Sequence, residues 1–458
     1  MTTRPDGSTA DSRRPTVTEA LARCAPADRE NARAALDWLL PEGGSWEDLS
    51  QLAVQKFLWY SLPMKWLVEP DEHHVVAAAL GRVLADAGLT RLAALCQSAA
   101  THRLIDLWDA DQSAARRELR RLLDTSGVEP PRTQRLEWGR FQGMDENRAS
   151  WVVSTELERA IDSGRLVPGA RGWRSVAVAV TDETLLAPGP DGSGASLLLS
   201  VLHERRASWL RDAARDGVVV PAPLVAALTG PPGDDATTTG RPSEEEVASL
   251  EPLRWLLEQV GPGAALTQAG LLPTALVRAA DERFHWSSDG PLRRIRGESD
   301  LPELATLHEL AREQRLLAVR KGRIAVTATG RAALANPPTR LDAVYARLLT
   351  PGTWRGDAGT AVGLALLGDA PVGPAMSTDE LYAAVAAFVA RRWRVAGGEP
   401  TASAITSVTW EVLRVASLFG WTVREADAWF AAPRLTPVGR AAVTRGLVRA
   451  AEAPRTRP

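Results

Sequence analysis

The chain has 458 residues, which is more than one compact core accommodates and predicts about three domains of ordinary size. Hydrophobic residues make up 45% and charged residues 24%, the balance of a folded globular protein rather than a disordered one. The formal net charge of −2 excludes a strongly basic nucleic-acid-binding chain and leaves only local basic patches to consider.

The cysteines and the N-terminal residues exclude further classes. Cys24 and Cys96 lie far apart and outside any paired motif, which excludes a disulfide framework and a cysteine-based zinc site. The chain lacks the apolar core of a signal peptide, and no window approaches the ~18 apolar residues of a membrane span. We therefore expect a cytoplasmic protein without membrane contact. Residues 1–14 are polar and predict a disordered arm.

Residues 15–229 predict a helical domain that is rich in tryptophan. Apolar residues recur at helical spacing through most of it, as in residues 45–62, a helix that Pro63 is expected to end. The valines of residues 176–180 alternate as in a strand. A lone strand has nothing to pair with in a helical domain, so a helix is favoured there.

Sixteen tryptophans stand against three tyrosines and six phenylalanines. Helical spacing predicts that most of them belong to the core. Trp138 and Trp173 lie in connecting segments between glycine and arginine, and these two are candidates for a protein interface, because tryptophan and arginine dominate interface energies. The helical domain is therefore an expected contact for a protein partner, with core packing as the alternative for both side chains.

Residues 230–247 predict a linker, because they are rich in proline, glycine, threonine and charge. We place the main domain boundary there. Two further units are predicted after it, at residues 248–338 and 339–450, followed by a basic tail at 451–458.

The unit at 248–338 predicts a definite order of elements. Ser299 is expected to cap the third helix, with Pro302 in its first turn, and Arg320-Lys321-Gly322 is expected to join the two strands of a hairpin with glycine at the turn. The order is a helix at 252–260, a short strand at 265–267, a helix at 273–284, a helix from 299, strands at 316–319 and 323–327, and a last helix from 331.

This order, which closes with RLLAVRKGRIAVTATGRAAL, resembles the winged helix-turn-helix superfamily. The ending recurs near the C-terminus, where LHELAREQRLL aligns with VLRVASLFGWT and TATGRAAL with TPVGRAAV. The alignment equates Thr327, Gly330 and Arg331 with Thr436, Gly439 and Arg440. Residues 250–450 as a whole resemble proteins of high-GC bacteria that carry tandem winged-helix units, a resemblance that implies no particular activity.

The resemblance implies a third helix in the major groove of DNA and a wing on the backbone. The third helix of the first unit opposes this, because Asp300, Glu303, Glu309 and Glu313 stand against Arg312 alone and carboxylates repel phosphates. A wing-led contact and a solvated hairpin tip remain as alternatives. The candidate DNA contacts of the first unit are Arg293, Arg294, Arg296, Arg320, Lys321 and Arg323.

The third helix of the second unit, around residues 403–418, is nearly neutral. The arginines that follow it predict a contact along a phosphate backbone, with a charged and solvated C-terminal helix as the alternative. These candidate DNA contacts are Arg434, Arg440, Arg445 and Arg449.

No catalytic signature occurs in the sequence. The six histidines form no metal-binding spacing, and the chain lacks a GxSxG elbow, a phosphate-binding P-loop and a GxGxxG motif. The acidic run 244–246 is explained by a helix N-terminus, where carboxylates are stabilising. We therefore predict no catalytic residue, no metal ligand and no cofactor.

The sequence predicts a mostly helical protein: a helical N-terminal domain followed by two winged-helix units with small β-hairpin wings. The leading hypothesis is a non-enzymatic protein that is associated with double-stranded DNA or regulates transcription. The alternative is a scaffold in which the winged helices are assembly modules. A third hypothesis is a sensor whose N-terminal helices hold a small ligand. The oligomeric state and the identity of any partner stay open.

Overall fold

The structure is a computed structural model that describes residues 14–189, 194–230, 242–261, 263–287, 295–369, 376–394, 398–424 and 431–455. Helices account for 68% of it and strands for 5%, which confirms the predicted mostly helical class. The chain forms two compact units. The first unit comprises residues up to Leu136 and Met144–Leu197, and the second comprises Glu137–Gly143 and the chain from Leu198 on.

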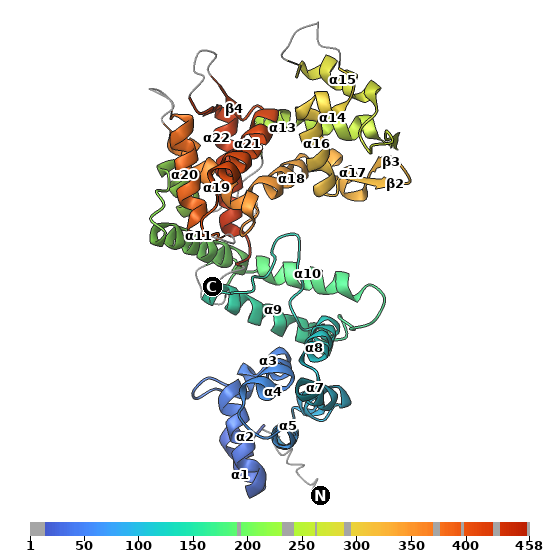
Figure 1. The fold of residues 1–458 in the computed structure, drawn as a ribbon. Coiled ribbons are helices and arrows are strands. Elements are labelled where there is room, and N and C mark those ends of the chain that lie inside the picture. The colour runs from blue at the N-terminus through green and yellow to red at the C-terminus, as the bar shows by residue number, and fades with distance from the viewer. Residues whose placement is uncertain are drawn as a thin grey trace, which may run out of the picture. The chain divides into compact units, whose positions relative to one another are not determined.

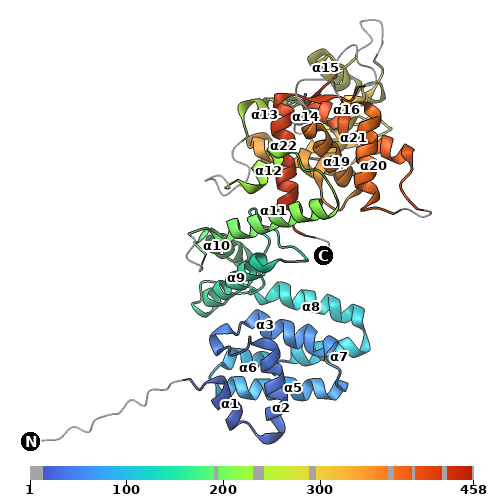
Figure 2. The same ribbon diagram turned by 90° about the vertical axis from the view of Figure 1, so that its left-hand side faces the viewer.

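The regular elements described in the first unit are all helices. In its core α2 packs on α5, and Leu36, Leu80 and Leu84 are buried there. Helices α7 and α8 lie side by side (Figures 1 and 2). The helices are α1 (Val17–Arg23), α2 (Pro26–Leu39), α3 (Gln51–Lys56), α4 (Leu62–Lys65), α5 (Pro70–Asp86), α6 (Thr90–Cys96), α7 (Ala99–Ala110), α8 (Gln112–Ser126), α9 (Met144–Asp162) and α10 (Trp173–Leu186).

Two predictions for this unit have opposite outcomes. Residues 176–180 lie within α10, so the preference for a helix over a strand is confirmed. The prediction that Pro63 ends its helix is wrong. A π-helical turn, η2 (Phe57–Ser61), leads directly into α4, and Leu62 donates its N–H to the carbonyl of Phe57. The shifted hydrogen-bond register lets the helix pass a proline, which has no N–H to donate.

The second unit surrounds α19, whose alanine- and leucine-rich sequence is buried on nearly every side. This helix contacts α18, α20, α21 and α22 (Figure 1). The helices of the unit are α11 (Leu197–Arg215), α12 (Ala222–Thr229), α13 (Glu244–Ser249), α14 (Glu251–Val260), α15 (Thr274–Phe284), α16 (Pro302–Glu313), α17 (Ala328–Ala335), α18 (Pro337–Leu349), α19 (Trp354–Gly368), α20 (Thr378–Ala390), α21 (Ala402–Leu418) and α22 (Pro437–Glu452).

The compact units do not divide at the predicted linker, of which residues 231–241 lie outside the described residues. Helix α12 contacts α22, and Leu224 and Leu228 belong to the same buried cluster as Leu253. Arg206 of α11 forms an ion pair of 2.6 Å with Glu452 of α22, and both side chains are buried. The residues before and after the predicted linker therefore share one core.

The chain from α14 to α17, which we call the first copy, follows the predicted order of elements. Its sheet is antiparallel, with β1 (Ala264–Ala265) on one side of β3 (Arg323–Val326) and β2 (Leu317–Arg320) on the other. Ser299 does not cap α16, contrary to the prediction. It lies in a 3-10 turn, η4 (Glu298–Asp300), that the Asp300 carboxylate closes by accepting the N–H of Arg296 and Gly297, so that α16 starts only at Pro302.

The chain from α18 to α22, which we call the second copy, repeats the end of the first. Its two strands, β4 (Thr422–Val423) and β5 (Arg434–Leu435), pair so that Thr422 faces Leu435. Leu317 faces Val326 in the first copy at the aligned positions. Register is therefore preserved, as the alignment of the two segments predicts.

The second strand of each hairpin leads into the last helix at a point that we call the join. The hydrogen bonds at the join are the same in both copies. The Thr327 hydroxyl donates to the Arg315 carbonyl at 2.6 Å and accepts the Gly330 N–H at 3.0 Å. The Thr436 hydroxyl donates to the Gly420 carbonyl at 2.9 Å and accepts the Gly439 N–H at 3.0 Å. The threonine thus caps the last helix and fastens it to the end of the preceding one.

The glycine of the motif is required by close approach. A Cβ on Gly330 would lie 2.3 Å from the Leu316 carbonyl oxygen, and one on Gly439 would lie 1.9 Å from that of Trp421. The T-x-x-G pattern therefore encodes a helix start that touches the backbone entering the hairpin.

Candidate nucleic-acid interface

The β2–β3 hairpin presents three of the predicted DNA contacts to solvent. Arg320 and Arg323 face each other across the two strands, and Lys321 with Gly322 forms the turn between them. Both turn residues have positive φ, as a tight hairpin of this type requires. The side chains of Arg320, Lys321 and Arg323 are exposed.

The basic character extends beyond the hairpin tip. Residues 314–341 contain six cations and no aspartate or glutamate. Arg340 is buried against the Ala333 carbonyl, but the other five are exposed, and none of them forms an ion pair with another described residue. This surface, which we call the basic hairpin surface, consists of Arg315, Arg320, Lys321, Arg323 and Arg331.

The remaining candidates of the first copy lie before α16. Arg296 is exposed, and its carbonyl accepts the Thr274 hydroxyl at 3.3 Å. Arg293 and Arg294 lie outside the described residues.

Two of the three acids of α16, Glu309 and Glu313, are engaged within the protein. The buried guanidinium of Arg347 pairs with Glu309 at 3.3 Å and also with Glu313. Arg347 reaches Glu411 of α21 at 2.8 Å as well, and Arg355 of α19 bridges the same two helices. We call these five residues the inter-helix ion network. It links α16 to α21, the two helices at the aligned position of the two copies.

The second copy uses its candidate arginines internally. Arg445 holds the buried carboxylate of Glu246 at 2.9 and 3.1 Å, and Arg440 donates to the carbonyls of Leu367 and Asp369 at the end of α19. A cation at a helix C-terminus satisfies carbonyls that lack helical partners.

The two other arginines complete this picture. Arg449 pairs with Asp342 of α18, and Arg434 lies half-buried in β5. Arg455 belongs to the predicted basic tail, and it contacts Ser208 of α11 at 3.3 Å. The row of arginines that looks like a phosphate contact in the sequence therefore holds helices together.

The predicted interface tryptophans are half-buried rather than exposed. The guanidinium of Arg174 lies over the Trp173 ring at 4.8 Å, and Trp138 makes interactions of its own. Among the tryptophans that the structure describes, the most exposed are Trp38, Trp151 and Trp410, at 50%, 44% and 42%. Both assignments to a protein interface stay predictions.

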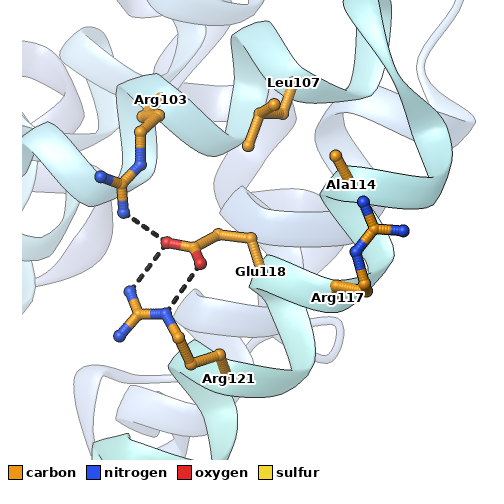
Figure 3. A pocket seen from close by; sticks show the side chains of 6 residues that line it. All are labelled: Arg103, Leu107, Ala114, Arg117, Glu118 and Arg121. Atoms are coloured by element: carbon orange, nitrogen blue, oxygen red, sulfur yellow. Dashed lines mark hydrogen bonds and ion pairs between the residues drawn. The ribbon is translucent and has the colours of Figure 1, made fainter.

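A second basic surface lies on α7 and α8, and the sequence analysis missed it. Figure 3 shows Glu118 between Arg103 and Arg121, both of which donate to its carboxylate, Arg121 at 2.7 Å through each of two nitrogens. Hydrogen bonds from Arg121 and Arg103 lower the pKa of Glu118 to about 2. Figure 3 draws no hydrogen bond or ion pair between Arg117 and the other residues shown. The run RRELRR at 116–121, with four arginines and one glutamate, is the sequence feature that predicts this surface.

The described residues offer neither a metal site nor a membrane-spanning helix. They contain no cluster of three or more histidine, cysteine, aspartate or glutamate side chains that fits a metal ion. The acidic run 244–246 starts α13, where Ser243 and Glu246 form a capping box. In the part of the chain that the structure describes, no helix has the length and apolar character to span a bilayer.

Comparisons with known proteins add no further assignment. No protein-family model matches the chain, and no curated protein and no solved structure matches it either.

Proposed function

We propose that the protein is a non-enzymatic cytoplasmic protein that associates with double-stranded DNA in a regulatory role, through tandem winged-helix units. One observation carries the proposal: the five cations of the basic hairpin surface are exposed and free of ion pairs with described residues. A cation that is not neutralised by the protein can replace a counterion on a phosphate, which is the main source of DNA affinity.

The contact we propose is led by the wing. Arg320, Lys321 and Arg323 lie along the phosphate backbone, and α16 stays out of the major groove. The inter-helix ion network supports this, because Glu309 and Glu313 hold α16 against α21 through Arg347. Phosphate contacts carry little sequence information, so the proposed binding has low sequence selectivity.

Binding of a duplex of mixed sequence, measured by fluorescence anisotropy across a salt series, tests this proposal. The full chain is expected to bind with an affinity that falls steeply as salt rises. The variant Arg320→Glu plus Lys321→Glu is expected to weaken binding and to reduce the salt slope by about two, since each lost phosphate contact removes roughly one.

Two variants serve as controls. Arg23→Glu plus Arg33→Glu makes the same change in charge at exposed positions of α1 and α2, and it is expected to leave the slope nearly unchanged. Arg116→Glu plus Arg117→Glu tests the basic surface of α8. Binding that is independent of salt, or that depends on α8 and not on the wing, contradicts the proposal.

A second function is favoured by a separate observation. The inter-helix ion network joins α16 to α21, so the helices that read DNA in winged-helix proteins are instead packed together. This arrangement favours the scaffold hypothesis, in which the two units are assembly modules. The salt series separates the two hypotheses, because a scaffold of this kind has no salt-dependent affinity for DNA.

A further inference from the structure

An apolar groove of about 580 Å³ lies in the second unit, between the segment that connects α11 to α12 and the helices α19 and α20. Its volume falls within the range of roughly 300–1,000 Å³ that is usual for small-ligand sites. The basic hairpin surface contributes no residue to it, so the groove is separate from the proposed DNA contact.

The floor and one wall of the groove are hydrophobic. Leu364 and Leu367 of α19 and Phe388 of α20 are buried beneath it. The connecting segment reads GVVVPAP at 217–223, and its Val219 is 86% exposed although it lines the groove. A valine in this position gains free energy when an apolar ligand covers it, at about 25 cal/mol for each Å² removed from water.

The opposite wall is a stripe of α20 that ends in a cation. Ala384, Ala387 and Arg391 follow one another at helical spacing, so they lie along one face. The two alanines leave room, since both are exposed and small. The Arg391 guanidinium lies at the mouth, 3.6 Å from the position that a Cβ on Gly217 would take.

Among the described residues that line the groove, Arg391 alone is charged, and it forms no ion pair with another of them or with any other described residue. Its neighbour Arg392 is engaged, because it pairs with Asp216 at 2.6 Å and its guanidinium lies 3.9 Å from the centre of the Phe388 ring. The groove thus combines apolar walls with one available positive charge at its mouth.

We propose that this groove binds a monomeric amphiphile with an apolar chain and a single carboxylate, as in a fatty acid. The chain lies over Leu364, Leu367 and Phe388, and the carboxylate pairs with Arg391, whose planar guanidinium suits a two-point contact. The site draws on residues 217–223, which belong to the helical domain 15–229 where a ligand is expected under the sensor hypothesis.

Calorimetric titration of the full chain tests the proposal, with dodecanoate and dodecyltrimethylammonium as probes below their micelle concentrations. Dodecanoate is expected to bind at one site, and the cation of equal chain length at least tenfold more weakly, a difference of about 1.4 kcal/mol. Arg391→Gln is expected to remove most of this preference. Ala387→Trp, which fills the groove, is expected to abolish saturable binding of both probes.

Ala383→Trp is the matched control, because Ala383 is exposed on the same helix but does not line the groove. It is expected to bind dodecanoate as the unmodified chain does. Equal affinity for both probes, or binding that survives Ala387→Trp, overturns the proposal. Circular dichroism of each variant shows that a loss of binding is not a loss of folding. These results leave the DNA proposal untouched, since no wing residue is changed.

Discussion

The two copies share one backbone join and differ in whether the arginines near it pair with carboxylates. In both, a threonine caps the last helix and a glycine lets that helix touch the backbone before the hairpin. In the first copy the cations around this join are exposed and pair with no described carboxylate, and Arg323 and Arg331 each donate to a backbone carbonyl. In the second copy Arg440 donates to a carbonyl at the end of α19, and Arg445 pairs with the buried carboxylate of Glu246.

This difference shows that the number of cations in a segment is not the number that can bind a partner such as DNA. The arginines of α22 outnumber those of the β2–β3 hairpin, yet most of their charge is neutralised within the protein. A paired cation must first leave its partner before it can bind a phosphate, and a buried carboxylate left behind is costly. The β2–β3 hairpin, although it has fewer arginines than α22, is therefore the better candidate for DNA contact.

The largest effect should follow from breaking the pair of Arg445 with Glu246. Arg445→Ala leaves a carboxylate that is 2% exposed without its cation, and we expect a loss of about 3–5 kcal/mol in the free energy of unfolding. Urea denaturation measures it. Adding Glu246→Gln should restore most of the loss, whereas Arg323→Ala in the first copy should change stability by less than about 0.5 kcal/mol. Equal losses in both copies would remove the distinction.

A smaller loss of stability should follow from substituting the glycine at the join in either copy. Gly330→Ala and Gly439→Ala each bring a methyl group against a backbone carbonyl that cannot easily move, and each should destabilise the protein by about 1–3 kcal/mol. The loss should be greater at Gly439, where the approach is closer. Gly297→Ala is the control, because a Cβ there meets nothing within 4 Å. A neutral result at either join glycine would contradict the shared geometry.

The smallest effect is a pH dependence confined to one copy. Burial opposes the ionisation of Glu246, but hydrogen bonds from Arg445 and Ser243 outweigh it and lower its pKa below 4.5. Because the folded pKa is depressed, this carboxylate stabilises the protein above pH 4.5, and the contribution is lost as the pH falls through the lowered value. Unfolding measured from pH 6 downwards should show this loss. The Arg445→Ala plus Glu246→Gln variant should lack that component, whereas Arg323→Ala should retain it.

Local structure could be predicted where local physics determines it. The alignment of Thr327 with Thr436 and of Gly330 with Gly439 anticipated a repeated join, because a cap and a close approach leave a signature within four residues. The β2–β3 hairpin could be predicted from the sequence in the same way, because Lys321–Gly322 suits a tight turn.

Long-range pairing could not be predicted in this way. Arg445 and Glu246 are 199 residues apart in the chain. The local sequence around either residue does not indicate that the other is its partner. The same holds for Arg347, whose three carboxylate partners come from α16 and α21. The sequence therefore showed the arginines of the second copy, but it did not show the distant residues that bind them. The misplaced cap at Ser299 has a local cause, because Asp300 competes for the same turn.

The short segment Glu137–Gly143 has a consequence for how the protein is made. It belongs to the second unit, where the Glu137 carbonyl accepts Arg205, and where Arg140 and Phe141 donate their N–H groups to the Arg455 carbonyl. A ribosome adds about 5–20 residues each second, so this segment waits on the order of tens of seconds for Arg455 to be synthesised. The second unit therefore closes only after Arg455 has been synthesised, and a recombinant fragment that starts at Leu198 lacks a strip of its own surface.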